Sequence, residues 1–123
     1  MFGFFKNKPL GEQGENHAAR FLRAQGYKIL DRNVQLGRYE IDIIAQEGDT
    51  TAFVEVKTRA TDDGFVPEEN VNPEKQRRII QAADIYISQK DDPEMYYRFD
   101  IVAIILPKKG APTIRLLRNA FQE

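Results

Sequence analysis

Two neighbouring stretches of the chain alternate apolar and polar side chains with a period of two, which is typical of β-strands. In residues 39–46 the alternate apolar positions are Ile41, Ile43 and Ala45. In residues 51–59 they are Ala52, Val54 and Val56. The turn-forming triplet Glu47-Gly48-Asp49 lies between the two stretches, so the pattern predicts a β-hairpin.

A helical spacing of apolar and small residues, with steps of three and four, covers residues 10–25 and ends at Gly26. A second helix is predicted from Asn72-Pro73, an N-cap residue followed by proline in the first turn, to just before Asp91. Its buried stripe consists of Ile79, Ile80, Ala83, Tyr86 and Ile87.

Three further strands complete the predicted set. Residues 27–36 suit a short or bent strand, residues 99–106 are almost wholly apolar, and residues 113–117 follow the turn Pro107-Lys108-Lys109-Gly110. Residues 60–72 have loop chemistry. The expected order is helix, three strands, helix, two strands, which predicts an α/β fold with a mixed sheet and a right-handed crossover.

Composition narrows the kind of protein and the chemistry open to it. With 123 residues, of which 41% are hydrophobic and 30% charged, we expect an N-terminal tail at residues 1–9 and a single domain at residues 10–123. The chain has no cysteine and one histidine, His17, which excludes disulfides, thiolate chemistry and multi-histidine zinc sites. Any metal would be a hard cation held by oxygen ligands.

The start of the chain is apolar for only five residues, which is too short for a signal-peptide core or a membrane span. We therefore expect a cytoplasmic protein without membrane association. Eighteen basic and nineteen acidic residues give a net charge of −1, whereas dedicated nucleic-acid binders usually carry a basic surface. Nucleic acid remains compatible with this charge only if the cations are gathered locally.

The predicted hairpin brings candidate chemistry together. Side chains two apart on a strand share a face, so Glu40 lies with Asp42, and Glu55 lies with Lys57. Two carboxylates and a backbone carbonyl can hold Mg²⁺ or Mn²⁺, and a lysine beside them suits hydrolysis at phosphate. Glu-x-Lys is also a common solvated pair on a strand. The residues alone leave these alternatives about evenly balanced.

Several motifs together resemble a known family. They are Gly11-Glu12-Gln13-Gly14-Glu15, Glu40-Ile41-Asp42-Ile43-Ile44-Ala45, Phe53-Val54-Glu55-Val56-Lys57-Thr58-Arg59, Lys75 and Arg98-Phe99-Asp100. This set resembles the YraN-like family of small uncharacterised bacterial proteins. That family is placed in the restriction-endonuclease-like superfamily and is similar to archaeal Holliday junction resolvases.

The resemblance implies a three-layer restriction-endonuclease-like domain that hydrolyses DNA phosphodiesters, with branched or otherwise structured DNA among its substrates. It also implies Mg²⁺ or Mn²⁺ as cofactor, held by Asp42, Glu55 and the Val56 carbonyl. Lys57 would be the catalytic lysine, and Glu15 on the first helix would be an additional catalytic acid.

Further residues are expected around this site. Glu40, Arg59 and Lys75 are candidate accessory residues, Arg98 is expected to pair with Asp100, and His17 is interpreted as a surface histidine. A two-fold substrate such as a junction would favour a homodimer. The alternative function is a non-catalytic module that keeps the nuclease fold and binds nucleic acid or a protein partner.

Overall fold

The computed structural model describes residues 10–64, 66 and 71–122. The predicted tail at residues 1–9 and part of the predicted loop at residues 60–72 lie outside the described residues. The elements are α2 (Leu10–Ala24), β1 (Lys28–Leu36), β2 (Tyr39–Glu47), β3 (Thr50–Arg59), α4 (Pro73–Lys90), β4 (Tyr96–Ile105) and β5 (Thr113–Phe121). Their order is the predicted one. Strand β4 begins three residues earlier than predicted, and β5 runs four residues further.

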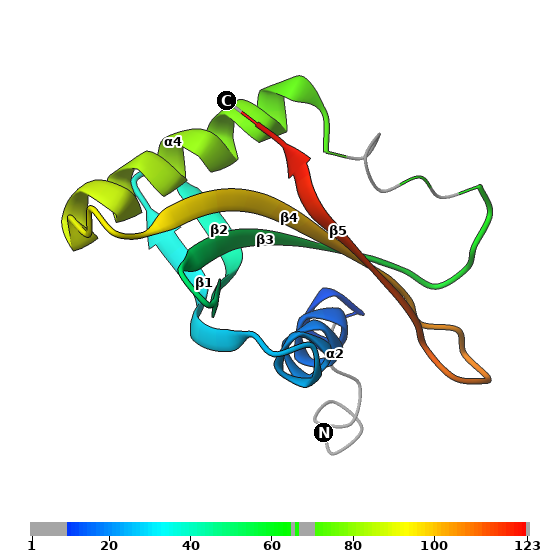
Figure 1. Cartoon of the computed structure of the whole chain (residues 1–123). Coiled ribbons are helices and arrows are strands. Elements are labelled where there is room, and N and C mark those ends of the chain that lie inside the picture. Colours follow the sequence, from blue (N-terminus) through cyan, green and yellow to red (C-terminus); the bar gives the residue numbers. More distant parts are fainter. Residues whose placement is uncertain (1–9, 65, 67–70, 123) are drawn as a thin grey trace, which may run out of the picture.

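The strands form one sheet in the order β1-β2-β3-β4-β5 (Figure 1). Neighbouring strands are antiparallel except β3 and β4, which run parallel and are connected through α4. A parallel pair needs a long crossover, and α4 supplies it. The sequence-based prediction of a mixed sheet is therefore confirmed.

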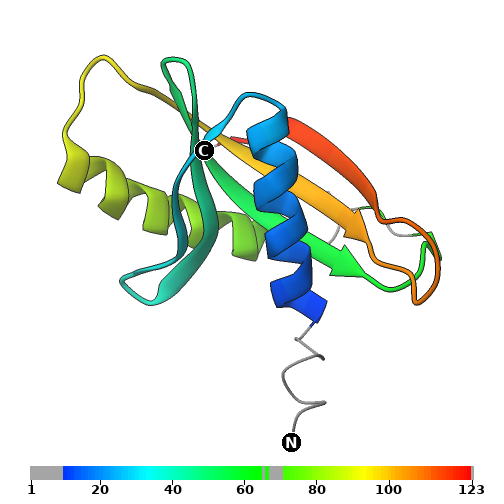
Figure 2. The same ribbon diagram turned by 90° about the horizontal axis from the view of Figure 1, so that it is seen from below.

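The two helices cover opposite faces of the sheet, so the described residues make a helix–sheet–helix sandwich (Figures 1 and 2). Under α4, Phe53 lies at the centre of one core and meets the ring of Tyr86 edge to face at 5.7 Å. Under α2, the second core holds Leu22, Ile43 and Val54. Within the described part of the chain, no helix is long and apolar enough to cross a membrane.

The predicted alternation along β2 is wrong at one point. We expected Ile41, Ile43 and Ala45 to share a face, yet Ile41 packs with Ile44 in the core under α4, while Ile43 and Ala45 pack under α2. Residues three apart share a face only where the period of two is broken, and the break falls around Asp42. Backbone pairing of β2 with β3 runs from Glu47–Thr50 to Ile43–Val54, immediately before Asp42.

The close packing of α2 on β3 depends on Gly14. A Cβ atom added at this position would overlap Oγ1 of Thr58 and lie 3.0 Å from its Cγ2. We expect Gly14→Ala to lower the free energy of unfolding by about 1–3 kcal/mol through overpacking. The matched variant Gly11→Ala meets nothing within 4 Å, so it should be neutral or stabilising by up to ~1 kcal/mol. Urea unfolding of both variants measures the change in the free energy of unfolding. Equal changes in the two variants would contradict the close contact between Gly14 and Thr58.

Candidate active site

The candidate site lies where β2 leaves its ladder with β3. The backbone N–H of Val56 donates to Oδ2 of Asp42 at 2.8 Å, so the side chain of Asp42 satisfies a backbone group of β3. The carboxyl groups of Asp42 and Glu55 are hydrogen-bonded to each other. Glu55 is only 7% exposed. The structure thus brings together the two acids that the hairpin predicted, which we call the acid pair.

The acid pair holds a proton unusually tightly. Burial raises the pKa of Asp42 to about 8, helped by the hydrogen bond and the negative charge of Glu55. The Val56 N–H and the positive charge of Lys75 act in the opposite direction but do not outweigh these effects. The carboxyl group of Asp42 therefore keeps its proton near pH 7.

Lys75 comes to the acid pair from the first turn of α4. Asn72 caps this helix, and its side chain accepts a hydrogen bond from the Lys75 backbone N–H at 2.9 Å. This hydrogen bond fixes the position of the Lys75 backbone in the first turn. The Nζ atom of Lys75 lies 3.3 Å from Oε2 of Glu55. Burial alone would lower the pKa of Lys75, but the charge of Glu55 leaves it raised. Lys75, predicted only as an accessory residue, contacts a member of the pair.

Lys57 lies two residues after Glu55 on β3, close enough to Lys75 for the charge of that lysine to act on it. Partial burial and the neighbouring positive charge of Lys75 lower the pKa of Lys57, although the acid pair opposes this shift. The two lysines therefore differ: the ion pair with Glu55 keeps Lys75 charged, while Lys57 can more readily give up its proton. The predicted association of Lys57 with Asp42 and Glu55 is present.

Glu15 reaches toward the acid pair from α2, on the opposite side of the sheet from α4. Its side chain is 17% exposed, and burial together with the negative charges of Asp42 and Glu40 raises its pKa. A hydrogen bond from Asn33 and the charge of Arg32, 4.0 Å away, act against this shift. Glu15 is thus close enough to Asp42 to be influenced by its charge.

The other predicted residues lie further out. Glu40 is exposed next to the β1–β2 turn, and Arg59 is exposed at the end of β3. His17 lies partly buried on α2 next to Arg20, 3.2 Å from its guanidinium, as expected of a histidine outside the site.

The donor set at the acid pair fits a hard divalent cation. Among the described residues, no three His, Cys, Asp or Glu side chains are grouped to hold a metal. Mg²⁺ does not need such a cage, because it keeps several waters and is commonly bound by one or two carboxylates. Asp42 and Glu55, with the Val56 carbonyl beside them, would supply this minimum. The proton of Asp42 and the ammonium group of Lys75 compensate the negative charge of the two carboxyl groups, which a bound cation would otherwise compensate.

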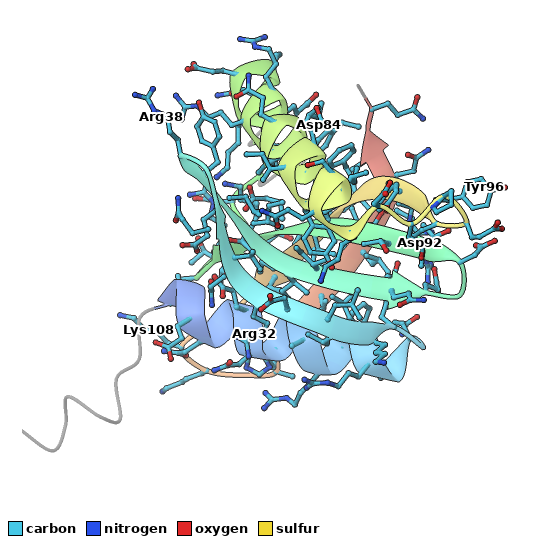
Figure 3. The ribbon with its side chains drawn as sticks, turned by 90° about the vertical axis from the view of Figure 1, so that its left-hand side faces the viewer. Arg32, Arg38, Asp84, Asp92, Tyr96 and Lys108 are labelled. Atoms are coloured by element: carbon cyan, nitrogen blue, oxygen red, sulfur yellow. The ribbon has the colours of Figure 1, made fainter. Side chains whose placement is uncertain are left out.

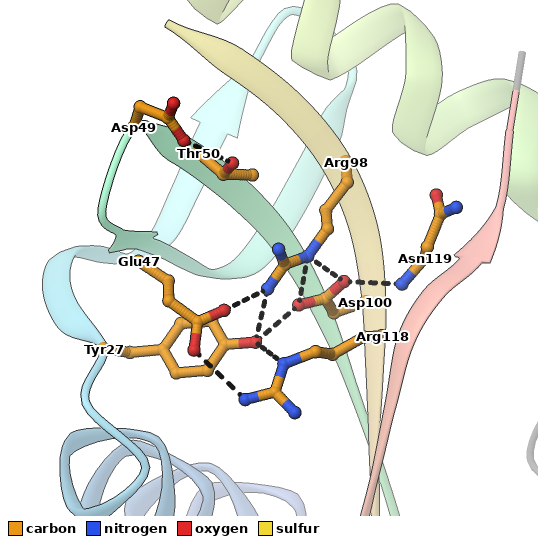
Figure 4. Close-up of polar contacts among 8 residues, drawn as sticks. All are labelled: Tyr27, Glu47, Asp49, Thr50, Arg98, Asp100, Arg118 and Asn119. Carbon is orange, nitrogen blue, oxygen red and sulfur yellow. Dashed lines mark hydrogen bonds and ion pairs between the residues drawn. The ribbon is translucent and has the colours of Figure 1, made fainter.

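A second group of charges, the polar clamp, is made of other residues than the acid pair (Figure 4). Asp100 is 0% exposed and accepts hydrogen bonds from the Tyr27 hydroxyl at 3.0 Å, from Arg98 Nε at 3.0 Å and from the Asn119 backbone N–H at 2.9 Å. The clamp consists of Tyr27, Glu47, Arg98, Asp100, Arg118 and the backbone of Asn119. It joins the residue before β1 to the end of β2, the first half of β4 and the end of β5.

The predicted pairing of Arg98 with Asp100 is confirmed, but the rest of the clamp was missed. Tyr27, Glu47 and Arg118 are separated from Asp100 by many residues and carry no motif. Every charged group of the clamp has a partner, so its role is structural rather than catalytic. A buried aspartate two residues after an arginine on an apolar strand was the available signal.

Together, the fold and the site define an α/β protein with two lysines and a carboxylate pair, of which Glu55 is buried and Asp42 partly buried, at a break in the β2–β3 hairpin. The chain belongs to the Uncharacterised protein family UPF0102, which it matches over residues 14–104, and the resemblance to the YraN-like family is thereby confirmed. The matched span includes the acid pair, both lysines and Glu15.

Relatives of nearly equal length support this assignment. The chain is 47% identical to a UPF0102 protein of Chlorobaculum parvum, covering 86% of this chain and 82% of the relative. It is 42% identical to one of Geobacter sulfurreducens, covering 98% and 94%. Among solved structures, it is similar to Pyrococcus furiosus SfsA in complex with Ca²⁺, with a TM-score of 0.40, 12% identity, and coverage of 83% of this chain and 58% of that chain.

Proposed function

We propose that this protein is a metal-dependent nuclease of the restriction-endonuclease-like superfamily that hydrolyses DNA phosphodiesters. The observation that carries the proposal is the meeting of Asp42 and Glu55 with Lys57 and Lys75 where β2 leaves β3. Burying two acids together is unfavourable unless a proton or a cation compensates for their charge. A site for a divalent cation explains why the chain has such a pair.

Each residue has a part in this chemistry. Asp42, Glu55 and the Val56 carbonyl would hold the cation, which when bound would stabilise negative charge on the phosphate and favour deprotonation of water. The lowered pKa of Lys57 suits it to accept a proton from the attacking water. The charged Lys75 is placed to attract a phosphate oxygen. Glu15 would shape the charge around Asp42 from the other side of the sheet.

The bonds in the reaction balance without another reactant. The oxygen of a water molecule forms a bond to phosphorus, and one phosphorus–oxygen ester bond breaks. The proton lost by the water passes to the Lys57 amine, and the leaving oxygen takes a proton from solvent. The site therefore needs only water and the cation to complete hydrolysis.

A cleavage assay tests the proposal. The wild type is incubated with linear, flap and four-way-junction DNA in Mg²⁺ or Mn²⁺, and we expect it to cut at least one substrate. Removing the proton acceptor in Lys57→Ala should slow cutting by roughly 10²–10⁴-fold. The control Lys28→Ala changes an exposed lysine at the start of β1 and should keep the wild-type rate.

Two results would contradict the proposed nuclease activity. Cutting that persists with a chelator, or that is unchanged in Lys57→Ala, would indicate a contaminant or a different site. Failure to cut any DNA, with no change in melting temperature on adding divalent cation, would favour the non-catalytic module.

A further inference from the structure

A hollow of about 230 Å³ adjoins the acid pair on the side of α4. We call it the basic hollow; it is lined by Arg38, Tyr39, Glu40, Lys75, Arg78 and Ile79. Its residues come from the β1–β2 turn and the first turns of α4. Arg38 projects at the tip of that turn (Figure 3). Lys75 lines the hollow and also contacts Glu55, so the hollow and the candidate site share this residue.

Charge distinguishes the two approaches to the acid pair. Among the described residues, the basic hollow is lined by three cations, Arg38, Lys75 and Arg78, and one acid, Glu40. Glu55 and Glu74 pair with Lys75 and Arg78, which leaves Arg38 as a further cation of the lining. In the described part of the chain, the hollow on the α2 side, about 560 Å³, is lined by one cation, Arg32, and two acids, Glu12 and Glu15, and Arg32 lies 4.0 Å from Glu15. Arg32 is already hydrogen-bonded to Asn16 at 2.8 Å. An approaching polyanion therefore meets more of the described cations on the α4 side than on the α2 side.

Two contacts hold Arg78 in the basic hollow, and a phosphate group can replace one of them. Its guanidinium lies 5.6 Å from the centre of the Tyr39 ring, which orients it. It also pairs with Glu74 at 2.8 Å, but the side chains of this pair are 51% and 65% exposed. Exposed ion pairs of this kind contribute little, so exchanging Glu74 for a phosphate oxygen is easy. Arg38 is exposed to solvent.

We propose that the basic hollow binds the phosphate groups of a DNA strand that flank the phosphodiester being cut, with Arg38 and Arg78 as the contacts. This inference rests on the proposed nuclease function and adds the path of the substrate strand. It would also allow a chain of net charge −1 to bind DNA, because described cations are gathered at one approach.

The test measures binding without cleavage. The parent is the full chain with Asp42→Asn, in a chelating buffer, and the probe is a fluorescent 12-nucleotide single-stranded DNA titrated at 50–200 mM KCl. Adding Arg38→Gln with Arg78→Gln should weaken binding roughly tenfold. It should also flatten the slope of log affinity against log salt by about 1.4, because each phosphate contact on a single strand contributes about 0.7.

A matched control separates a local site from net charge. Arg23→Gln with Lys28→Gln removes two exposed cations, one in the last turn of α2 and one at the start of β1. Lys28 lies about 26 Å from the β1–β2 turn at about 3.3 Å per residue. This pair should leave the slope almost unchanged. The proposal that the basic hollow binds DNA would be overturned by equal losses of affinity in both double variants. It would also be overturned by no loss in either variant, or by no DNA binding of the parent. If the double variants differ in DNA affinity as expected but the wild type cuts no DNA, only the proposed nuclease activity would be overturned.

Discussion

Asparagine at position 42 is expected to stabilise the metal-free protein at pH 8 and, at the same time, to abolish metal-dependent cleavage. The amide resembles a protonated carboxyl group in shape and needs no proton to lie beside Glu55. It cannot supply the negative charge that binds a cation, so we expect the cleavage rate to fall by about 10³-fold or more.

The pH dependence of stability follows from the direction of the Asp42 shift. The pKa is about 8 in the folded protein and ordinary in the unfolded chain, so the folded state binds the proton more tightly. The stabilising contribution of Asp42 is therefore fully present at pH values below the pKa of this group in the unfolded chain. It is lost as the pH rises through about 8, the pKa in the folded protein. Between these limits, stability should fall by up to about 1.4 kcal/mol per pH unit.

Chemical unfolding in a chelating buffer at pH 5, 6.5 and 8 measures this effect. The wild type should lose stability toward pH 8 relative to Asp42→Asn, and the two curves should diverge. The control Asp84→Asn changes an exposed acid on α4 and should keep the wild-type dependence. Parallel curves for wild type and Asp42→Asn would contradict a proton held at the acid pair.

The second large effect is expected at the polar clamp. Asp100→Ala removes the acceptor of three hydrogen bonds and leaves the Tyr27 hydroxyl, the Asn119 N–H and part of the Arg98 guanidinium without it. Breaking a buried charged pair by removing one partner destabilises by about 3–5 kcal/mol. Thermal and urea unfolding of the variant should show a loss of this size.

A clamp variant at the surface provides the comparison. Arg118 is 46% exposed and pairs with Glu47 at 3.1 Å, so Arg118→Gln should lower stability by about 1 kcal/mol or less. Both variants leave the acid pair intact, so any folded fraction of Asp100→Ala should keep its affinity for divalent cation. Equal, small losses in the two variants would show that the clamp does not hold β1, β4 and β5 together.

The order of elements could be predicted because each one carries a strong local pattern. The hairpin has period two, and α4 begins with Asn72-Pro73, both of which depend only on neighbouring residues. The break at Asp42 could not be predicted in this way. Ile41 continues the apolar alternation in the sequence, but in three dimensions it joins the core under α4, because β2 separates from β3 there.

The candidate site was predictable to the same extent. Asp42 and Glu55 meet because a hairpin brings close positions together, and Lys57 follows by strand alternation. The contact of Lys75 with Glu55 depends on where the crossover places the start of α4. Contacts such as Tyr27 with Asp100, which are 73 positions apart, depend on the complete packing and have no local signal.

The central claim is that the acid pair is a divalent-cation site, and calorimetric titration of Mn²⁺ into the metal-free protein tests it most directly. At pH 7 a cation that binds there must displace the proton of Asp42. Titrations in two buffers of different ionisation enthalpy should therefore show one Mn²⁺ bound and about one proton released, with no binding by Asp42→Asn. Equal binding by wild type and Asp42→Asn, or no binding by the wild type, would contradict the claim.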